Sequence, residues 1–236
     1  MEKLISFFRV FNNMENTVPK YIIIGLVAVA AVILILYFNL ITMQKTITNF
    51  SNPVVSTTGS QYLYNIQTPT NILSISVDFS MTPVPNSMPP ADGIQIILGS
   101  NNVNFTGGIW QCRMQGNCVC NSGKPISFNG IMAGIETYYN SSCSDMAGAP
   151  YLFICTSNGN CYTTSIPQIS QQISGTLTVD VSSSEIKASL KLNNGSLYTV
   201  TAPLSIKTNL AEVSVTTGNN YAIWNLNSIN VKYAII

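Results

Sequence analysis

The stretch LSISVDFSM, residues 73–81, alternates between apolar and polar side chains without a break. Three serines and Asp78 occupy the polar positions. The apolar positions are Leu73, Ile75, Val77, Phe79 and Met81. Because successive side chains of a β-strand point to opposite faces, this period of two predicts a half-buried strand of a β-sandwich.

Similar patterns continue to the end of the chain. GIQIILG (93–99) is a nearly continuous apolar strand, and GTLTVDV (175–181) and IKASLKL (186–192) flank SSSE as an antiparallel hairpin. AEVSVTTG (211–218) and YAIWNLNSINVKY (221–233) supply the last strands. Since no amphipathic helical window of useful length follows residue 46, we expect one all-β sandwich over residues 61–236.

The N-terminal region has a different composition. YIIIGLVAVAAVILILYFNLITM (21–43) is apolar almost throughout and carries no charge. About 20 such residues cross a bilayer core of about 30 Å, so we expect a retained transmembrane helix in contact with membrane lipid. A buried core helix and a cleaved signal peptide are the alternatives, but the run is long for a signal peptide and lacks an A-x-A-like cleavage site. Residues 44–60 are expected to form a polar stalk or linker.

The charges flanking this apolar run predict its orientation. Lys3, Arg9 and Lys20 precede it, whereas Lys45 is the only basic residue after it until Arg113. The positive-inside rule therefore places the tail, residues 1–20, in the cytoplasm or virion interior and the C-terminal domain outside, on a cell surface or virion envelope. Gly25 and nearby alanines would allow close helix packing, which is compatible with a homo-oligomer.

Composition excludes several function classes. The 236 residues carry a formal net charge of +1, and only 8% are charged, which gives no electrostatic basis for nucleic-acid binding. The chain has no histidine, which removes the usual general base and most mixed-ligand zinc sites.

The cysteines agree with an exported domain. An even number within 50 residues of the predicted exterior part predicts three disulfides, with fifteen pairings open. Cys155 and Cys161 flank a turn-rich TSNGN segment and are the pair we expect to be bonded. The six cysteines are Cys112, Cys118, Cys120, Cys143, Cys155 and Cys161. Four N-x-S/T sequons also suit export, at Asn49, Asn104, Asn140 and Asn194.

The order of motifs resembles the L-type (legume) lectin family, whose members have the concanavalin A-like jelly roll. The similar segments, in chain order, are SISVDFSM, ADGIQIIL, TGGIW, AGIETYYN, GTLTVDVSSSEIKASLKL, VSVTTG and YAIWNLNSINVKY. Each is weak alone, but together they span nearly all of residues 60–236. The resemblance implies a concanavalin A-like β-sandwich that binds carbohydrate.

The resemblance also implies a calcium site in IETYYNSSCSD (135–145). By position, the ligands would be Glu136, the backbone carbonyl of Tyr138, Asn140 and Asp145. Hard oxygen donors on a loop suit Ca²⁺, which accepts six to eight of them. The second, transition-metal site of the family is expected to be missing, because Gly134 stands where a glutamate would bind and the later histidine position falls near Tyr151.

A sugar pocket beside the calcium is implied as well. Asp92 would accept hydrogen bonds from sugar hydroxyls, and a backbone N–H near Gly107 and Gly108 would donate one. The ring of Tyr138 or Tyr139 would stack on a pyranose, and the Asn140 amide would donate to the sugar. Thr217 and Gly218 would belong to the last specificity loop, and the Ala91–Asp92 peptide is expected to be cis. A glycan on Asn140 would instead block that residue as a ligand.

These features lead to two functional predictions. The first is a membrane-anchored surface protein that binds glycans or glycoproteins on a facing surface for adhesion or receptor attachment. The alternative is a structural surface or coat protein, such as a viral envelope component, with a lectin-like fold and no sugar binding; the composition is similar to that of exterior proteins of archaea and their viruses. We expect no enzymatic activity, because the closely spaced carboxylates of glycosidases with this fold are missing.

Overall fold

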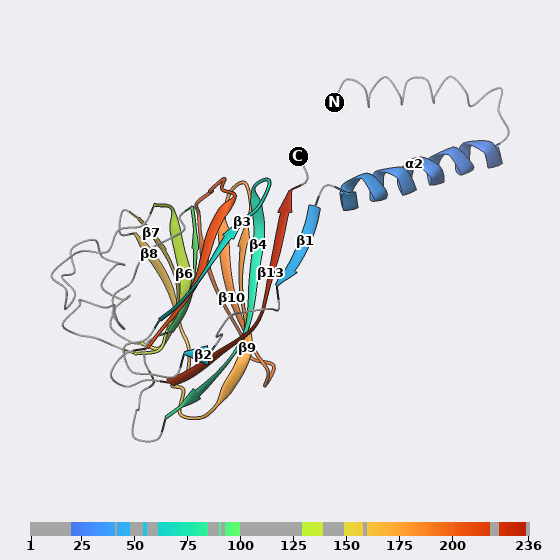
Figure 1. Cartoon of the computed structure of the whole chain (residues 1–236). Helices are drawn as coiled ribbons and strands as arrows, with labels where there is room; N and C mark the ends of the chain where they lie inside the picture. The colour runs from blue at the N-terminus through green and yellow to red at the C-terminus, as the bar shows by residue number, and fades with distance from the viewer. Residues whose placement is uncertain are drawn as a thin grey trace. The chain divides into compact units, whose positions relative to one another are not determined.

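The computed structural model describes residues 20–40, 42–47, 54–55, 61–84, 90, 93–99, 129–138, 149–157, 160–217 and 222–234 (Figure 1). The chain divides into two compact units, with the division after Thr42. The first unit contains the helix α2, Lys20–Leu40, and the second contains the β-strands.

Helix α2 has 21 residues and matches most of the predicted apolar segment. Its described large apolar side chains are exposed, from Ile22 to Leu34, at 44–68% of their surface. In the described part of the chain, no helix is both long and apolar enough to cross a membrane. The membrane anchor therefore stays a prediction.

The second unit is a sandwich of two sheets (Figure 1). In the described residues, one sheet has the order β1 (Thr42–Ile47), β13 (Ala222–Ala234), β4 (Ile72–Pro83), β9 (Ile173–Val181), β10 (Ile186–Leu192), β11 (Leu197–Ala202), with β2 (Val54–Val55) also on β13. The other has the order β3 (Gln61–Gln67), β12 (Leu210–Thr216), β5 (Gly93–Leu98), β6 (Ile131–Glu136), β7 (Tyr151–Thr156), β8 (Cys161–Ser165). The all-β prediction is confirmed.

The core lies between the two sheets and follows the alternation in the sequence. In β4, Ile75, Val77, Phe79 and Met81 are fully buried, as their period of two predicted. Ring centroids of Phe79 and Trp224 lie 5.7 Å apart in this core.

One residue of the opening stretch departs from the pattern. Leu73 is only half-buried, and Ile72 is buried in its place. The reason is a register shift in the β4–β13 pairing: Lys232 pairs with Ser74, whereas the next residue, Tyr233, pairs with Ile72. Such an irregularity moves the following side chain to the other face of the sheet.

The predicted linker also differs from expectation. Within residues 44–60, the stretch up to Ile47 belongs to β1, and Val54–Val55 forms β2. The predicted span, residues 21–43, is shortened at its end, because Thr42 and Met43 are part of β1. Without β1 and β2, one side of β13 would be a sheet edge with unpaired N–H and C=O groups. Both segments pair with β13 and so provide partners for these groups.

Candidate functional site

The register of the six-stranded sheet brings three of the predicted site segments together. Thr216, the last residue of β12, pairs with Gly93, the first residue of β5. Gly93 pairs on its other side with Glu136, the last residue of β6. The three residues thus form one cross-strand row, in which the glycine between the two polar residues has no side chain.

Glu136 is fully buried at the point where β6 ends. Its Oε1 accepts a hydrogen bond from the backbone N–H of Tyr138 at 3.1 Å, which holds the carboxyl group against its own loop. Tyr138 is half-buried. A carboxylate is buried only where hydrogen bonds or a cation compensate for the lost water, so this position suits an ion ligand.

The end of β12 supplies hydroxyl groups at the same edge. Thr216 and Thr217 are both fully buried. Thr216 Oγ1 has no hydrogen-bond partner among the described residues, which marks a polar atom that a bound water, ion or ligand can satisfy.

Several polar residues of this face could not be identified from the sequence. Glu212 and Ser214 precede Thr216 on β12 at alternate positions, and Gln95 lies on β5 opposite Ser214. All are fully or almost fully buried, and Gln95 Nε2 donates to Ser214 Oγ at 2.6 Å. In AEVSVT, apolar and polar residues alternate, which identifies the polar face of the strand. Such alternation is typical of a face exposed to solvent, so the sequence does not indicate that this polar face is buried.

This face also carries a second apolar cluster, separate from the core. Ile97, Met132, Tyr151, Phe153 and Cys155 form the cluster, and each has at most 3% of its surface exposed. The six-stranded sheet therefore buries both of its faces.

Oxygen donors lie at both ends of the row. Among the described residues they are the Glu136 carboxylate, the Tyr138 carbonyl two residues further and the orphaned Thr216 hydroxyl, all oxygen. Oxygen donors suit Ca²⁺, whereas zinc and other transition metals favour nitrogen and sulfur. The described residues contain no group of three His, Cys, Asp or Glu that could hold a metal by themselves.

Gly134, which stands where the family has a glutamate ligand for its transition metal, is tightly packed. A Cβ added to Gly134 would lie 2.4 Å from the Ile94 carbonyl oxygen and 2.8 Å from Gln95 Cα. No side chain fits there without a shift of β5. Tyr151, near the other position, packs its ring edge-on against Phe153.

The remaining predicted site residues lie outside the described residues: Asp92, Gly107, Gly108, Tyr139, Asn140, Asp145 and Gly218. The expected cis peptide at Ala91–Asp92 lies there too, and the described chain has a cis peptide at Ala149–Pro150. Asp92 directly precedes Gly93, so the chain connectivity keeps it within one residue of the row.

The predicted pairing of Cys155 with Cys161 is confirmed. The two residues are opposite each other in the β7–β8 hairpin, with an S–S distance of 2.09 Å and Cα atoms 4.1 Å apart. The other cysteines lie outside the described residues, as do the sequons at Asn49, Asn104 and Asn140. Asn194 is exposed in the turn between β10 and β11, and its Oδ1 accepts the Ser196 N–H at 2.9 Å.

Comparison with known proteins supports the predicted fold. No family profile and no curated protein sequence matches the chain. Among solved structures, peanut lectin with a nine-residue peptide is similar at a TM-score of 0.57 and 15% identity, covering 83% of this chain and 99% of the lectin. The Bauhinia forficata lectin in complex with GalNAc is similar at 0.56 and 15%, covering 83% and 93%.

A similar structure outside the seed lectins is the exoplasmic/lumenal domain of VIP36 in its Ca²⁺/Man3GlcNAc-bound form. Its TM-score is 0.52 at 14% identity, with coverage of 83% of this chain and 87% of that domain. The β-sandwich of this chain therefore has the concanavalin A-like fold of the L-type lectins.

Proposed function

We propose that this protein is a membrane-anchored surface protein that binds carbohydrate at the Thr216–Gly93–Glu136 row, for adhesion or receptor attachment. The observation that carries the proposal is the row itself. The resemblance to the lectins points to the β5, β6 and β12 segments, and the register of the sheet has them as neighbouring strands.

In this proposal Glu136, the Tyr138 carbonyl, Asn140 and Asp145 hold a calcium ion. With calcium bound, these residues would hold the segment after β6 in place and so orient the sugar-binding groups. Asp92 accepts hydrogen bonds from two sugar hydroxyls, and the backbone near Gly107 and Gly108 donates. Tyr138, Asn140, Thr217 and Gly218 complete the pocket. The lectins of similar structure include ones bound to GalNAc and to Ca²⁺ with Man3GlcNAc, which supports sugar as the ligand class.

The anchor is proposed from α2 and its flanks. The apolar run that overlaps α2, residues 21–43, carries no charge, and about 20 such residues cross a bilayer core of about 30 Å. Its exposed apolar side chains need a non-aqueous partner, and lipid provides one. A disulfide such as Cys155–Cys161 persists in oxidising compartments, which supports an exterior location for the sandwich.

Two buried carboxyl groups raise the question of glycosidase chemistry, and their positions argue against it. Glu136 pairs with Gly93 of β5, whereas Glu212 pairs with Ile97, four residues further along the same strand. Strand rise and spacing place their backbones about 16 Å apart. Glycoside hydrolysis needs carboxyls about 5–10 Å apart, so we propose a binding protein rather than an enzyme.

A structural surface or coat protein without sugar binding is the second candidate. The observation in its favour is the Tyr138 N–H bond to Glu136 Oε1, by which the loop already satisfies one oxygen of the proposed calcium ligand. The low charge of the chain also suits close packing between neighbouring copies on a surface.

A glycan array separates the two candidates. The full chain, in a detergent without a sugar headgroup, is applied with calcium and then with a chelator. Binding of a defined set of glycans that disappears with the chelator supports the lectin proposal. A folded, disulfide-bonded protein that binds no glycan under either condition supports the structural role.

A further inference from the structure

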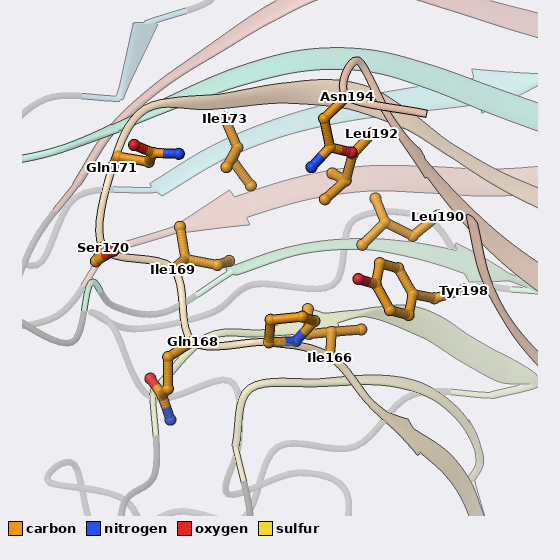
Figure 2. A pocket seen from close by; sticks show the side chains of 11 residues that line it. Ile166, Gln168, Ile169, Ser170, Gln171, Ile173, Leu190, Leu192, Asn194 and Tyr198 are labelled. Carbon is orange, nitrogen blue, oxygen red and sulfur yellow. The ribbon is translucent and has the colours of Figure 1, made fainter. Parts of the chain in front are cut away.

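A pocket of about 210 Å³ lies beside the β10–β11 hairpin (Figure 2). Its walls come from the connection between β8 and β9, from the first residue of β9, and from β10 and β11. Seven residues form its apolar surface: Ile166, Pro167, Ile169, Ile173, Leu190, Leu192 and Tyr198.

The base of the pocket is part of the main core. Ile166, Ile169 and Leu190 are buried members of that core, and Ile173 and Leu192 pack against it. Figure 2 shows four side chains directed toward a common space: Ile169, Ile173, Leu190 and Leu192. The hydroxyl of Tyr198 faces the same space. An apolar group in the pocket would therefore rest on the core of the sandwich.

Hydrogen bonds outside the pocket hold both walls in place. Gln168 Nε2 donates to the Ala149 carbonyl at 3.1 Å, and Figure 2 shows its side chain pointing away from the space. On the other wall, Asn193 Nδ2 donates to Ser174 Oγ at 2.6 Å, which ties the hairpin turn to β9.

The polar groups that line the pocket are neutral. None of its eleven lining residues is charged, which disfavours an ion as the occupant because nothing would replace the ion's water. The Tyr198 hydroxyl and the Asn194 amide nitrogen have no hydrogen-bond partner among the described residues. Both are available to one polar group of a ligand.

We propose that this pocket binds a small uncharged compound with an apolar ring and one hydroxyl group. The ring would lie against Ile169, Leu190 and Leu192, and the hydroxyl would bond to Tyr198 or Asn194. An apolar cavity of about 150 Å³ holds benzene, so 210 Å³ leaves room for a ring with one or two substituents. The lining of this pocket shares no residue with the proposed sugar site.

Titration of the full chain with p-cresol tests the proposal, with toluene and p-toluate as comparators. The protein is made in the bacterial periplasm, which forms disulfides, and without N-glycosylation, so that Asn194 stays unmodified. We expect saturable 1:1 binding of p-cresol and at least about tenfold weaker binding of the p-toluate anion. Tyr198→Phe should weaken p-cresol binding about two- to tenfold and leave toluene unchanged.

Leu192→Trp should fill the pocket and abolish binding, with Ile173→Phe as a second blocking variant if the first does not fold. Leu197→Ala is the matched control, because that side chain is on the same hairpin but 62% exposed and outside the pocket. In the unmodified chain, p-cresol should slow hydrogen exchange in residues 166–173 and 190–198. Unsaturable binding, full affinity in a folded blocking variant, or protection elsewhere would overturn the assignment.

Discussion

Glu136 and Thr216 lie on either side of Gly93 in one cross-strand row, although 80 residues separate them in the sequence. Two strand spacings put their backbones about 10 Å apart. A ligand that contacts both would bridge β6 and β12 over the glycine. In the proposed function the calcium ligand Glu136 lies at one end of the row, and Thr217 of the sugar pocket directly follows the other end.

Replacement of Glu136 tests the calcium part of the proposal. With calcium at about 100 times its dissociation constant, binding should stabilise the wild-type chain by about 2.7 kcal/mol and raise its melting temperature. Glu136→Gln should remove that calcium-dependent increase, which differential scanning calorimetry would detect. Glu185→Gln, an exposed acid in the β9–β10 turn, should keep it. An equal calcium effect in wild type and Glu136→Gln would exclude Glu136 as a ligand.

The buried Gln95–Ser214 hydrogen bond should contribute to stability. Ser214→Ala leaves the Gln95 amide buried without its acceptor, which should lower the free energy of unfolding by about 1–3 kcal/mol. Gln95→Leu combined with Ser214→Ala should recover part of the loss, because both polar groups are then removed. Urea unfolding of the single and double variants measures the coupling. Additive losses would mean that the two side chains act independently.

The Cys155–Cys161 disulfide closes a short loop. Loop-closure entropy for about seven residues predicts that Cys155→Ala/Cys161→Ala loses about 2 kcal/mol. The double variant is preferable to a reductant, because a reductant also acts on the other cysteines. Thermal unfolding measures the loss, and peptide mapping of the wild type should recover the pair. An unchanged melting temperature would show that the bond does not constrain the unfolded chain.

The ionisation of Tyr62 should make the stability of the sandwich depend on pH in the alkaline range. Burial, and then the neighbouring Tyr64, raise the pKa of Tyr62 above 10.0. A raised pKa in the folded state means that the neutral phenol stabilises the fold below pH 10 and that this contribution is lost as pH rises through the folded pKa. Tyr62→Phe should therefore unfold less steeply with pH above about 10 than the wild type. Identical alkaline unfolding curves would assign the effect to other groups.

The sequence predicted strands well where one face is apolar and the other polar. Residues 75–81 and the β9–β10 hairpin keep their alternation of buried and more exposed side chains in the structure. The pairing of Cys155 with Cys161 was also predictable, because a turn-rich segment separates them.

Other features depend on tertiary structure and could not be read from local patterns. The local sequence predicts exposure to solvent for three polar residues that the structure buries: Gln95, Glu212 and Ser214. No local sequence pattern shows that the six-stranded sheet is covered on both faces. The edge pairing that turns part of a polar linker into β1 and β2 depends on β13, about 180 residues away. The resemblance to lectins predicted which segments meet at the site, and the register supplied their order across the sheet.

The most direct test of sugar binding at this row is titration of the strongest glycan from the array into four proteins. They are the wild type, Asp92→Ala, Glu136→Gln and the control Glu185→Gln, each with calcium and with chelator. We predict that wild type and control bind only with calcium, and that both site variants lose at least about tenfold in affinity. Full affinity in Asp92→Ala and Glu136→Gln, or a chain for which no glycan binds, would contradict the account.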